Sequence, residues 1–423
     1  MTPLLSLLSL LTACSEPSGT DADLPYENQA PELLDQSPRG GGLEAPGAFS
    51  SPHLAADVTQ GASPAGAACN AFAADLYAQL PQTGNLIFSP ASIQMAMAMT
   101  MTAAAGETRE SIEAGLHLDF ADSDQEMGQW LRALNATSET HTLRLSSRLW
   151  HADDLAVEPQ FQELSAMLFN VYPESLSFEE PETARQVINH WVAEETDSLI
   201  PELVPSGALT PQTRLVLSNA VYFLADWERP FDPDETAERP FNTPTAVVSV
   251  PFMNATADQL VGTLPGAKTL VLPYAGGAQE LVLLLPDEGR SIDEFGPEAL
   301  TAAADSVSPQ FTELALPTLA LDWKQSLVEH LIALDMGPAF SSQADFSTLS
   351  DEDLMLSEVI HQSFLKMDEL GTEAAAVTGV TMKPASVPPP PQVSMIVDRP
   401  YLFGILDVDS GALLFVARVE NPL

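Results

Sequence analysis

The apolar run from residue 91 to 105 places the strongest constraint on the fold. It follows Pro90, a residue well suited to open a helix, and contains Met95, Met97, Met99 and Met101. A helix that is apolar on every side must be surrounded by other elements. We therefore expect a large core with several layers, and the 45% of hydrophobic residues in the 423-residue chain suffices to build one. The methionines are interpreted as packing residues rather than as ligands.

The other periodic segments indicate one α+β domain from residue 67 to 423, although the length alone would allow two or three domains. Apolar residues at helical spacing predict helices, and β-branched and aromatic runs predict strands. The expected helices are residues 69–80, 91–105, 183–196 and 326–334. The expected strands are residues 143–151, 214–223, 247–253, 267–274, 280–286, 315–321, 359–367, 401–406 and 413–419. Helices come mainly first and strands mainly later, which is typical of α+β proteins.

Residues 1–13 have the pattern of a signal peptide. Residues 4–11 are apolar apart from two serines, and this stretch is too short to span a bilayer. The stretch ends in Leu11-Thr12-Ala13-Cys14, which resembles the lipobox of bacterial lipoproteins, and we expect lipidation at Cys14. Because no Lys or Arg precedes the apolar stretch, an ordinary cleaved signal peptide and a different start codon stay open.

Residues 14–66 are rich in Pro, Gly, Ser, Ala and acidic residues and show no periodicity. Such a composition predicts a disordered tether. A signal, a lipidation site and a tether together predict a protein that is secreted, and either extracellular or lipid-anchored at the cell envelope.

The charge and the missing motifs exclude several functions. Sixteen basic and 59 acidic residues give a net charge of −43, which repels nucleic acid and anionic polysaccharide. No H-E-x-x-H, C-x-x-C, G-x-x-x-x-G-K-[ST] or G-x-S-x-G pattern occurs. We therefore expect no metal, no cofactor and no enzymatic activity. Of the two cysteines, Cys14 lies in the signal region, so Cys69 is expected as a buried thiol without a disulfide partner.

Residues 368–391 do not fit the pattern of the elements around them. They lie between two predicted strands, begin with small, weakly polar residues and end in four prolines, which favour an extended and exposed chain. A loop of about twenty residues in a compact domain is usually functional. Small residues enter a sheet without steric cost, and Thr and Val favour the strand state. The segment is therefore interpreted as a loop in one state and a strand in another.

Five motifs in the same order resemble those of the serpin family. The segment 369–376 resembles the hinge of the reactive-centre loop, and 85–93 resembles the shutter segment. Residues 217–223, followed by 227–231, resemble the central strand and the breach. The other marks are His361 ahead of 364–369, and the C-terminal signature at 398–403 and 418–422. The resemblance covers about residues 67 to 423.

The resemblance implies a serpin fold, with three β-sheets including a large central sheet A, eight or nine helices and an exposed reactive-centre loop. It also implies a suicide inhibitor of serine proteases, because cleavage of the loop releases stored strain as the loop adds a strand to the sheet. The native state is then metastable. The implied partner is a target protease held in a covalent complex. We expect a monomer, and no heparin-like activator, because residues 107–142 lack a basic cluster.

The resemblance also assigns site residues. Family spacing from Glu369 places the scissile bond at Ala385–Ser386, and a small residue there suits an elastase-like or subtilisin-like protease. The long stretch 387–397 leaves a neighbouring bond open, and cleavage after Lys383 would mean a trypsin-like target, although Pro384 disfavours it. The hinge residues are Glu369, Gly371, Thr372, Glu373, Ala374, Ala375 and Ala376. The shutter and breach residues are Ser89, Ser92, Asn219, Trp227 and His361. Of these, Ser89, Ser92, Asn219 and His361 are interpreted as a buried hydrogen-bond cluster that gates strand opening, not as a catalytic triad.

One alternative function stays open. Gly379 and the proline run would also suit a non-inhibitory serpin that acts as a surface binding or chaperone-like protein. The composition of the hinge argues for inhibition, since the three alanines and Thr372 are compatible with insertion.

Overall fold

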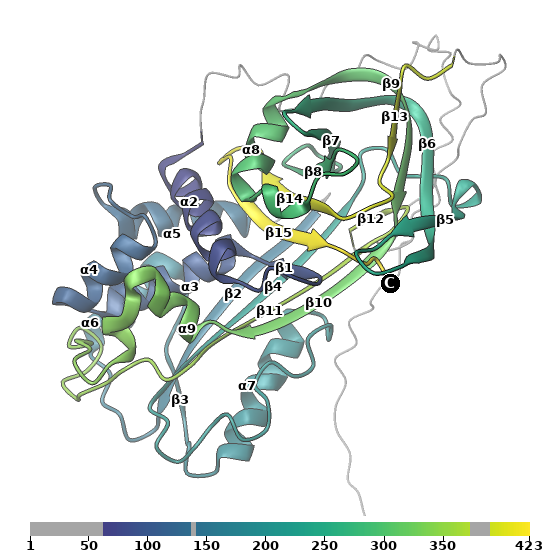
Figure 1. Cartoon of the computed structure of the whole chain (residues 1–423). Helices are drawn as coiled ribbons and strands as arrows, with labels where there is room; N and C mark the ends of the chain where they lie inside the picture. The colour runs from purple at the N-terminus through teal and green to yellow at the C-terminus, as the bar shows by residue number, and fades with distance from the viewer. Residues whose placement is uncertain (1–61, 137–140, 373–389) are drawn as a thin grey trace, which may run out of the picture. The chain divides into compact units, whose positions relative to one another are not determined.

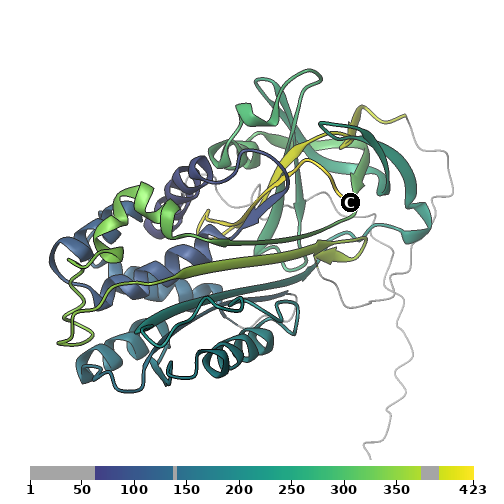
Figure 2. The same ribbon diagram turned by 60° about the horizontal axis from the view of Figure 1, so that its bottom comes forward.

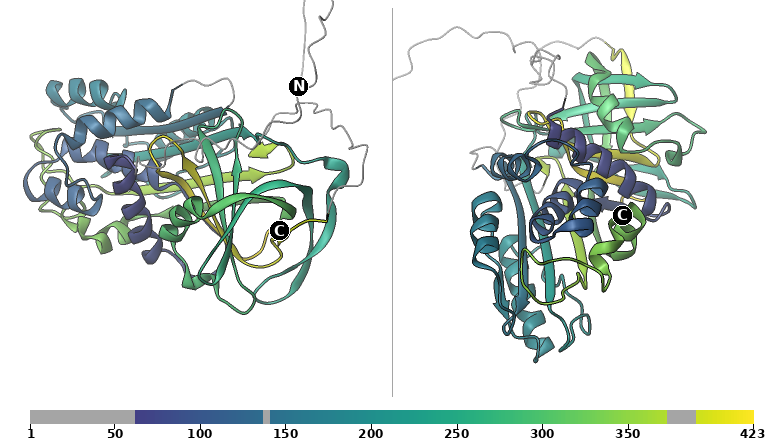
Figure 3. Two further views of the ribbon diagram at one scale, coloured as in Figure 1. Left: turned by 90° about the horizontal axis from the view of Figure 1, so that it is seen from above. Right: turned by 90° about the vertical axis from the view of Figure 1, so that its left-hand side faces the viewer.

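A computed structural model describes residues 62–136, 141–372 and 390–423. The helices of the first half gather at one end of a long six-stranded sheet, and a nine-stranded sheet lies at the other end (Figures 1 and 3). These first helices are α2 (Pro64–Gln79), α3 (Pro90–Ala103), α4 (Gly106–Gly115), α5 (Ser123–Leu134) and α6 (Pro159–Phe169). In the described ranges no helix is long and apolar enough to cross a membrane.

Helix α3 lies in the centre of the core, as its composition predicts. All of its residues are buried, and it packs against helices α2, α4, α5 and α6 and against strands of both sheets. Ser89 caps it, because its side chain accepts a hydrogen bond from the backbone N–H of Ser92 at 3.2 Å. The start of α3 is thereby fixed directly beneath the six-stranded sheet.

The six-stranded sheet has the order β10-β11-β12-β4-β2-β3. Its strands are β10 (Leu319–Ser326), β11 (Val359–Met367), β12 (Gly371–Thr372), β4 (Leu215–Asp226), β2 (His141–Ala152) and β3 (Glu174–Leu176). Strand β4 is paired with β2 along almost its whole length, and β11 with β10. Helix α7 (Pro181–Glu195) covers the face of this sheet opposite to α3 (Figure 2). Both faces are therefore covered, which explains why most β4 residues are buried.

The nine-stranded sheet begins with β1 and ends with β13. It contains β1 (Leu86–Phe88), β15 (Leu413–Val419), β14 (Tyr401–Asp407), β8 (Gln279–Pro286), β7 (Ala267–Pro273), β6 (Val247–Leu264), β9 (Val307–Pro317) and β13 (Val393–Ile396), with β5 (Ala237–Asn242) paired to β6. The long strand β6 pairs with β5, β7 and β9, and so connects these three strands in one sheet. Helix α8 (Pro297–Asp305) packs on this sheet. The short helices are η1 (Pro233–Glu235), η2 (Ile292–Glu294), α9 (Val328–Leu331), η3 (Ile332–Met336) and η4 (Gly337–Phe340).

The structure confirms the α+β class and corrects several expected features. The described strands form two sheets, where the resemblance implies three, and the strand expected over 247–253 continues to Leu264 as β6. The sequence predicts one strand over residues 315–321, but the chain leaves one sheet and enters the other at Thr318, which separates β9 from β10. The expected helix 326–334 is shorter than predicted, because Ser326 still belongs to β10 and the backbone leaves the helical region at Leu334 and Asp335. Cys69 is fully buried as expected, and burial raises the pKa of its thiol.

Candidate functional site at the seam between β4 and β11

The first residues of the predicted hinge already form a strand. Thr372 pairs with Ala225 of β4 on one side and with Met367 of β11 on the other, antiparallel to both. A Cβ on Gly371 would lie 2.1 Å from the backbone oxygen of Ala225, so only glycine fits there. Thr372 is 1% exposed, and its hydroxyl lies 2.6 Å from the hydroxyl of Tyr274. The hinge therefore enters the sheet at Gly371 and Thr372.

We use the word seam for the line along which β4 and β11 face each other, and we call its end at Thr372 the breach. Trp227 covers the breach. Its Nε1 donates to the backbone oxygen of Asp368 at 2.9 Å, and its backbone N–H donates to the backbone oxygen of Leu370 at 2.8 Å. Its ring stacks on Tyr274, with centroids 4.6 Å apart. Burial raises the pKa of the Tyr274 phenol, so the hydroxyl that faces Thr372 stays protonated. The tryptophan thus binds the chain just ahead of the inserted residues.

Glu369 holds the same approach segment from its other side. Its backbone oxygen accepts a hydrogen bond from the backbone N–H of Phe231 at 2.8 Å. Its side-chain Oε1 accepts one from the hydroxyl of Thr236 at 2.6 Å. These contacts fix where the hinge begins, because the residues before Gly371 cannot shift along β4 without breaking them.

The seam is closed only at its far end. Strands β4 and β11 pair directly and in parallel over four residues each, 217–220 with 359–362. Eight residues along both strands separate the pair Leu217–Val359 from the positions Ala225 and Met367 that flank Thr372. The relative register of the two strands is therefore the same at both ends. A third strand could occupy the whole seam once the four direct pairs separate.

A buried hydrogen-bond cluster, which we call the shutter, lies under these four pairs. The Oδ1 atom of Asn219 accepts from the hydroxyl of Ser92 at 2.6 Å and lies 3.3 Å from Nδ1 of His361. Its Nδ2 donates to the backbone oxygen of Ser92 and to the hydroxyl of Ser147. Every polar atom of the Asn219 side chain is therefore satisfied, which such a buried amide requires.

The hydrogen bonds of His361 fix its tautomer. The backbone N–H of Ser89 donates to Nε2 at 3.1 Å, so this nitrogen carries no proton. The hydroxyl of Ser363 also lies 2.8 Å from Nε2. Nδ1 then carries the proton and donates to Asn219. Burial lowers the pKa of His361 to about 3, so the ring is neutral and joins α3, β4 and β11 in one network.

The shutter does not have the geometry of a catalytic site. His361 is 1% exposed and Ser363 is 0% exposed, so a substrate cannot reach either of them. Among the described residues, no group of three or more His, Cys, Asp and Glu side chains could hold a metal ion. The serines and the histidine join elements far apart in sequence, and this is a structural role.

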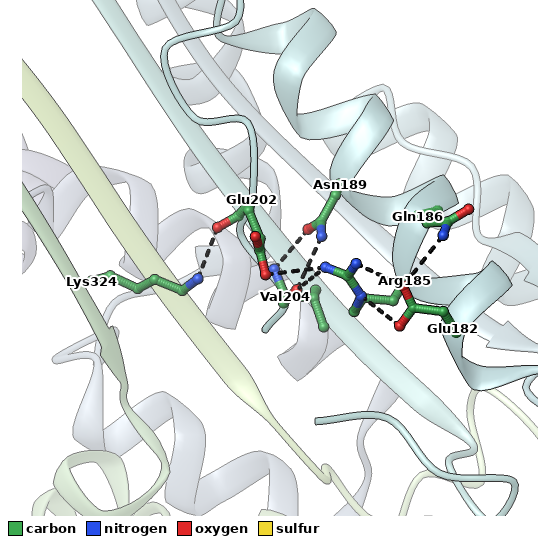
Figure 4. A network of polar contacts seen from close by, with 7 residues as sticks. All are labelled: Glu182, Arg185, Gln186, Asn189, Glu202, Val204 and Lys324. Atoms are coloured by element: carbon green, nitrogen blue, oxygen red, sulfur yellow. Dashed lines mark hydrogen bonds and ion pairs between the residues drawn. The ribbon is translucent and has the colours of Figure 1, made fainter. Parts of the chain in front are cut away.

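Helix α7 and the segment after it lie across the seam and reach β10 (Figure 4). Lys324 of β10 donates from Nζ to the backbone oxygen of Glu202 at 2.8 Å. Arg185 of α7 donates to Glu202 Oε1 at 3.1 Å, and Asn189 exchanges two hydrogen bonds with the backbone of Val204. Gln186 and Glu182 extend the network along α7.

The position of Lys324 shows which part of the seam this network lies beside. Lys324 pairs with Gln362, and Gln362 pairs with Ala220, one of the four direct pairs. The network is therefore anchored level with the closed part of the seam and not with the breach. We call it the α7 strap.

The structure brings most of the described predicted residues together. Ser89, Ser92, Asn219 and His361 form the shutter, and Trp227, Glu369, Gly371 and Thr372 form the breach. The predicted residues Cys14, Glu373, Ala374, Ala375, Ala376, Ala385 and Ser386 lie outside the described residues. Sequence reasoning missed Tyr274, Ser147 and Ser363. Ser147 lies opposite Asn219 on β2, a pairing that no local pattern could reveal.

The fold and the site define a class of protein in which a short strand, the start of a longer segment, lies between two strands of a sheet at the end where they do not pair directly. The chain belongs to the serpin family, whose model, described as "Serpin (serine protease inhibitor)", matches residues 67–422. Leukocyte elastase inhibitor from Bos taurus is 32% identical over 374 residues, which are 84% of this chain and 99% of that protein.

Solved structures agree with this assignment. The thermophilic serpin tengpin in its native state has a TM-score of 0.76 and 27% identity, over 84% of this chain and 93% of that one. Thyroxine-binding globulin in complex with thyroxine has a TM-score of 0.75 and 25% identity, over 85% of this chain and 98% of that one. Other relatives come from an archaeon, a plant and mammals.

Proposed function

We propose that this chain is a suicide-substrate inhibitor of a serine protease. The protease would cleave the segment between β12 and β13 and form an acyl-enzyme. The cleaved segment would then enter the seam between β4 and β11 and trap the enzyme in a covalent complex. The observation that carries the proposal is β12, which lies between these strands in the orientation that a full insertion requires.

The register of β12 supports the fit of the remaining segment. Six residues after Thr372 is Thr378, and six residues before Ala225 and Met367 are Asn219 and His361. An inserted strand that kept this register would place Thr378 between the two shutter side chains and offer them a hydroxyl.

The alternation of side chains supports the same fit. In the inserted strand the residues on the core side with Thr372 would be Ala374, Ala376, Thr378 and Val380. All of them are small or β-branched, so the core could accept them without overpacking.

We propose Ala385–Ser386 as the bond that is cut, and an elastase-like or subtilisin-like enzyme as the target. The small side chain of Ala385 fits the primary pocket of such enzymes. Cleavage after Lys383 by a trypsin-like enzyme is the competing assignment.

Mixing the full chain with an elastase-like and a subtilisin-like protease tests both proposals. A complex that survives SDS, and a released peptide that begins at Ser386, are the expected results. The same proteases with the nucleophilic serine changed to alanine are the control and should give no complex. Clean cleavage without a complex, across several proteases, would support a non-inhibitory binding or chaperone-like protein instead. Thyroxine-binding globulin, solved with thyroxine bound, shows that a protein of this fold can carry a ligand.

We also propose that Cys14 is lipidated and anchors the domain at the cell envelope. Cys14 and the preceding Leu11-Thr12-Ala13 support this. Labelling with a fatty-acid analogue should modify the wild type but not Cys14→Ser, and equal labelling of both would contradict the proposal.

A further inference from the structure

A cavity of about 540 Å³ lies between α5, the start of β2 and two turns of the nine-stranded sheet. Helix α5 contributes Trp130 and Glu126, and β2 contributes His141. The turn before β8 contributes Ala278, and the turn after β14 contributes Asp409. Its volume lies within the range of small-molecule sites. None of these residues belongs to the seam, and we call this space the α5 cavity.

Among the described residues, three buried polar atoms that line the α5 cavity have no hydrogen-bond partner. They are Nε1 of Trp130, Nδ1 of His141 and Oε1 of Gln279. Trp130 is 6% exposed and Gln279 is 4% exposed, so open solvent does not satisfy these atoms. A buried polar group without a partner is costly, and several around one cavity indicate that something polar occupies it.

The partners of Gln279 show which of its groups is left for an occupant. Its Nε2 donates to Oδ1 of Asp407 at 3.4 Å, which leaves its Oε1 to accept. The Nε1 of Trp130 can only donate. The occupant must therefore offer at least one acceptor and one donor.

The charges around the cavity define the sign of the occupant. Asp407, Glu126 and Asp409 are carboxylates, and none of the described residues that line the cavity is Lys or Arg. Asp407 is tied by its own turn, since its Oδ2 accepts from the backbone N–H and the hydroxyl of Ser410. Glu126 and Asp409 have no cationic partner among the described residues. An anion would be repelled, and a cation would be attracted.

We propose that the α5 cavity binds a small organic cation that also carries hydroxyl or carbonyl groups. An amino sugar or an amino-acid amide has this chemistry. The protonated amine would lie near Glu126 and Asp409, an oxygen of the ligand would accept from Trp130, and a hydroxyl or amide N–H would donate to Gln279.

Calorimetric titration of the full chain with glucosamine and with lysinamide tests the proposal, and glucose serves as the neutral match to glucosamine. We expect saturable binding of at least one amine, about tenfold or more tighter than glucose, because burying its charge beside carboxylates is favourable. Binding should also raise the melting temperature of the chain. Which amine binds distinguishes the two ligand sources.

Two variants and a control distinguish a built site from general attraction to an acidic protein. Trp130→Phe removes the N–H donor together with part of the ring system and should weaken binding about fivefold. Glu126→Gln, at the half-buried rim, should weaken it by a similar factor and keeps the test valid if Trp130→Phe fails to fold. Glu329→Gln removes the same charge from an exposed position on α9 outside the cavity and should leave binding unchanged.

Three results would overturn the proposal. Binding that does not saturate for either amine would mean a cavity that holds only water. Equal binding of glucose would remove the role of charge. Equal weakening by Glu329→Gln and Glu126→Gln would mean general attraction. None of these results bears on protease inhibition, because the seam residues are untouched.

Discussion

The two ends of the seam between β4 and β11 differ in what separates the strands. At the breach, Thr372 lies between Ala225 and Met367 and is buried against Tyr274. At the shutter, β4 and β11 pair directly, and Asn219 and His361 hold them from below. The strand register is the same at both ends. The breach therefore displays locally the arrangement that insertion would extend, and the shutter is the part that must open.

The largest expected effect comes from placing a charge at the breach. Thr372→Arg would place an unpaired guanidinium in the buried position beside Tyr274, which expels β12 from the seam and removes the start from which insertion would continue. We expect the variant to be cleaved by the target protease at the wild-type rate but to form almost no SDS-stable complex. Thr372→Ser is the matched control and should inhibit normally, because it keeps the hydroxyl. Undiminished inhibition by the arginine variant would mean that inhibition does not depend on Thr372 at the breach.

Removing one shutter partner should be the next largest effect. Asn219→Ala removes the partner of the buried Ser92 hydroxyl and of Nδ1 of His361, at a cost of about 1–3 kcal/mol for each buried group left unsatisfied, and it also removes the contact to the half-buried Ser147. The unfolding temperature of the intact protein should fall markedly. In a double-mutant cycle, Asn219→Ala with His361→Ala should cost clearly less than the sum of the two single changes. Additive losses would mean that the shutter is not one unit.

Acid should weaken the shutter through His361. Its pKa is lowered from 6.5 to about 3 in the folded chain, so the unfolded chain binds more protons between these values. Stability from this group is complete above about pH 6.5 and falls as the pH drops toward 3, by about 1.4 kcal/mol per pH unit at most. His361→Gln should remove this part of the pH dependence. A wild type and a variant with the same slope of unfolding temperature against pH would contradict the assignment.

The smallest expected effect concerns the α7 strap. Lys324→Ala removes the hydrogen bond to Glu202 and should change the free energy of unfolding by less than about 1 kcal/mol, since the contact is exposed. Insertion should nevertheless be faster, measured as a higher yield of complex per cleaved inhibitor. Lys268→Ala is the control, because Lys268 makes a similar exposed contact to the backbone oxygen of Ser394 in the nine-stranded sheet. Equal effects of the two changes on the yield of complex would mean that the α7 strap does not slow insertion.

Local patterns predicted the elements whose burial is uniform. Strand β11 and strand β15 have the ends expected from their apolar runs, and the all-apolar composition of α3 predicted its burial. Helices α4, α5 and α6 were not predicted, because they bury only part of a short amphipathic face. Strand β12 has two residues, which is too short for any periodicity.

Only those site residues that belong to a recognisable sequence motif could be predicted. The resemblance identified Asn219 and His361, but no pattern in the sequence connects them with Ser147 or Ser363, which reach the cluster through strand register. Tyr274 lies at the end of a strand in the other sheet, and only the packing of the two sheets brings its hydroxyl to Thr372. Contacts between strands remote in sequence depend on register, which a single sequence does not reveal.

Thermal unfolding before and after cleavage of the 373–389 segment tests the central claim most directly. Insertion would add a central strand, with ladder hydrogen bonds on both sides, to a sheet that is now closed by four residue pairs. We predict that the cleaved wild type melts on the order of 10 °C or more above the intact protein, and that cleaved Thr372→Arg does not. An unchanged melting temperature of the cleaved wild type would mean that the seam does not open, and that β12 is only the fixed end of a loop.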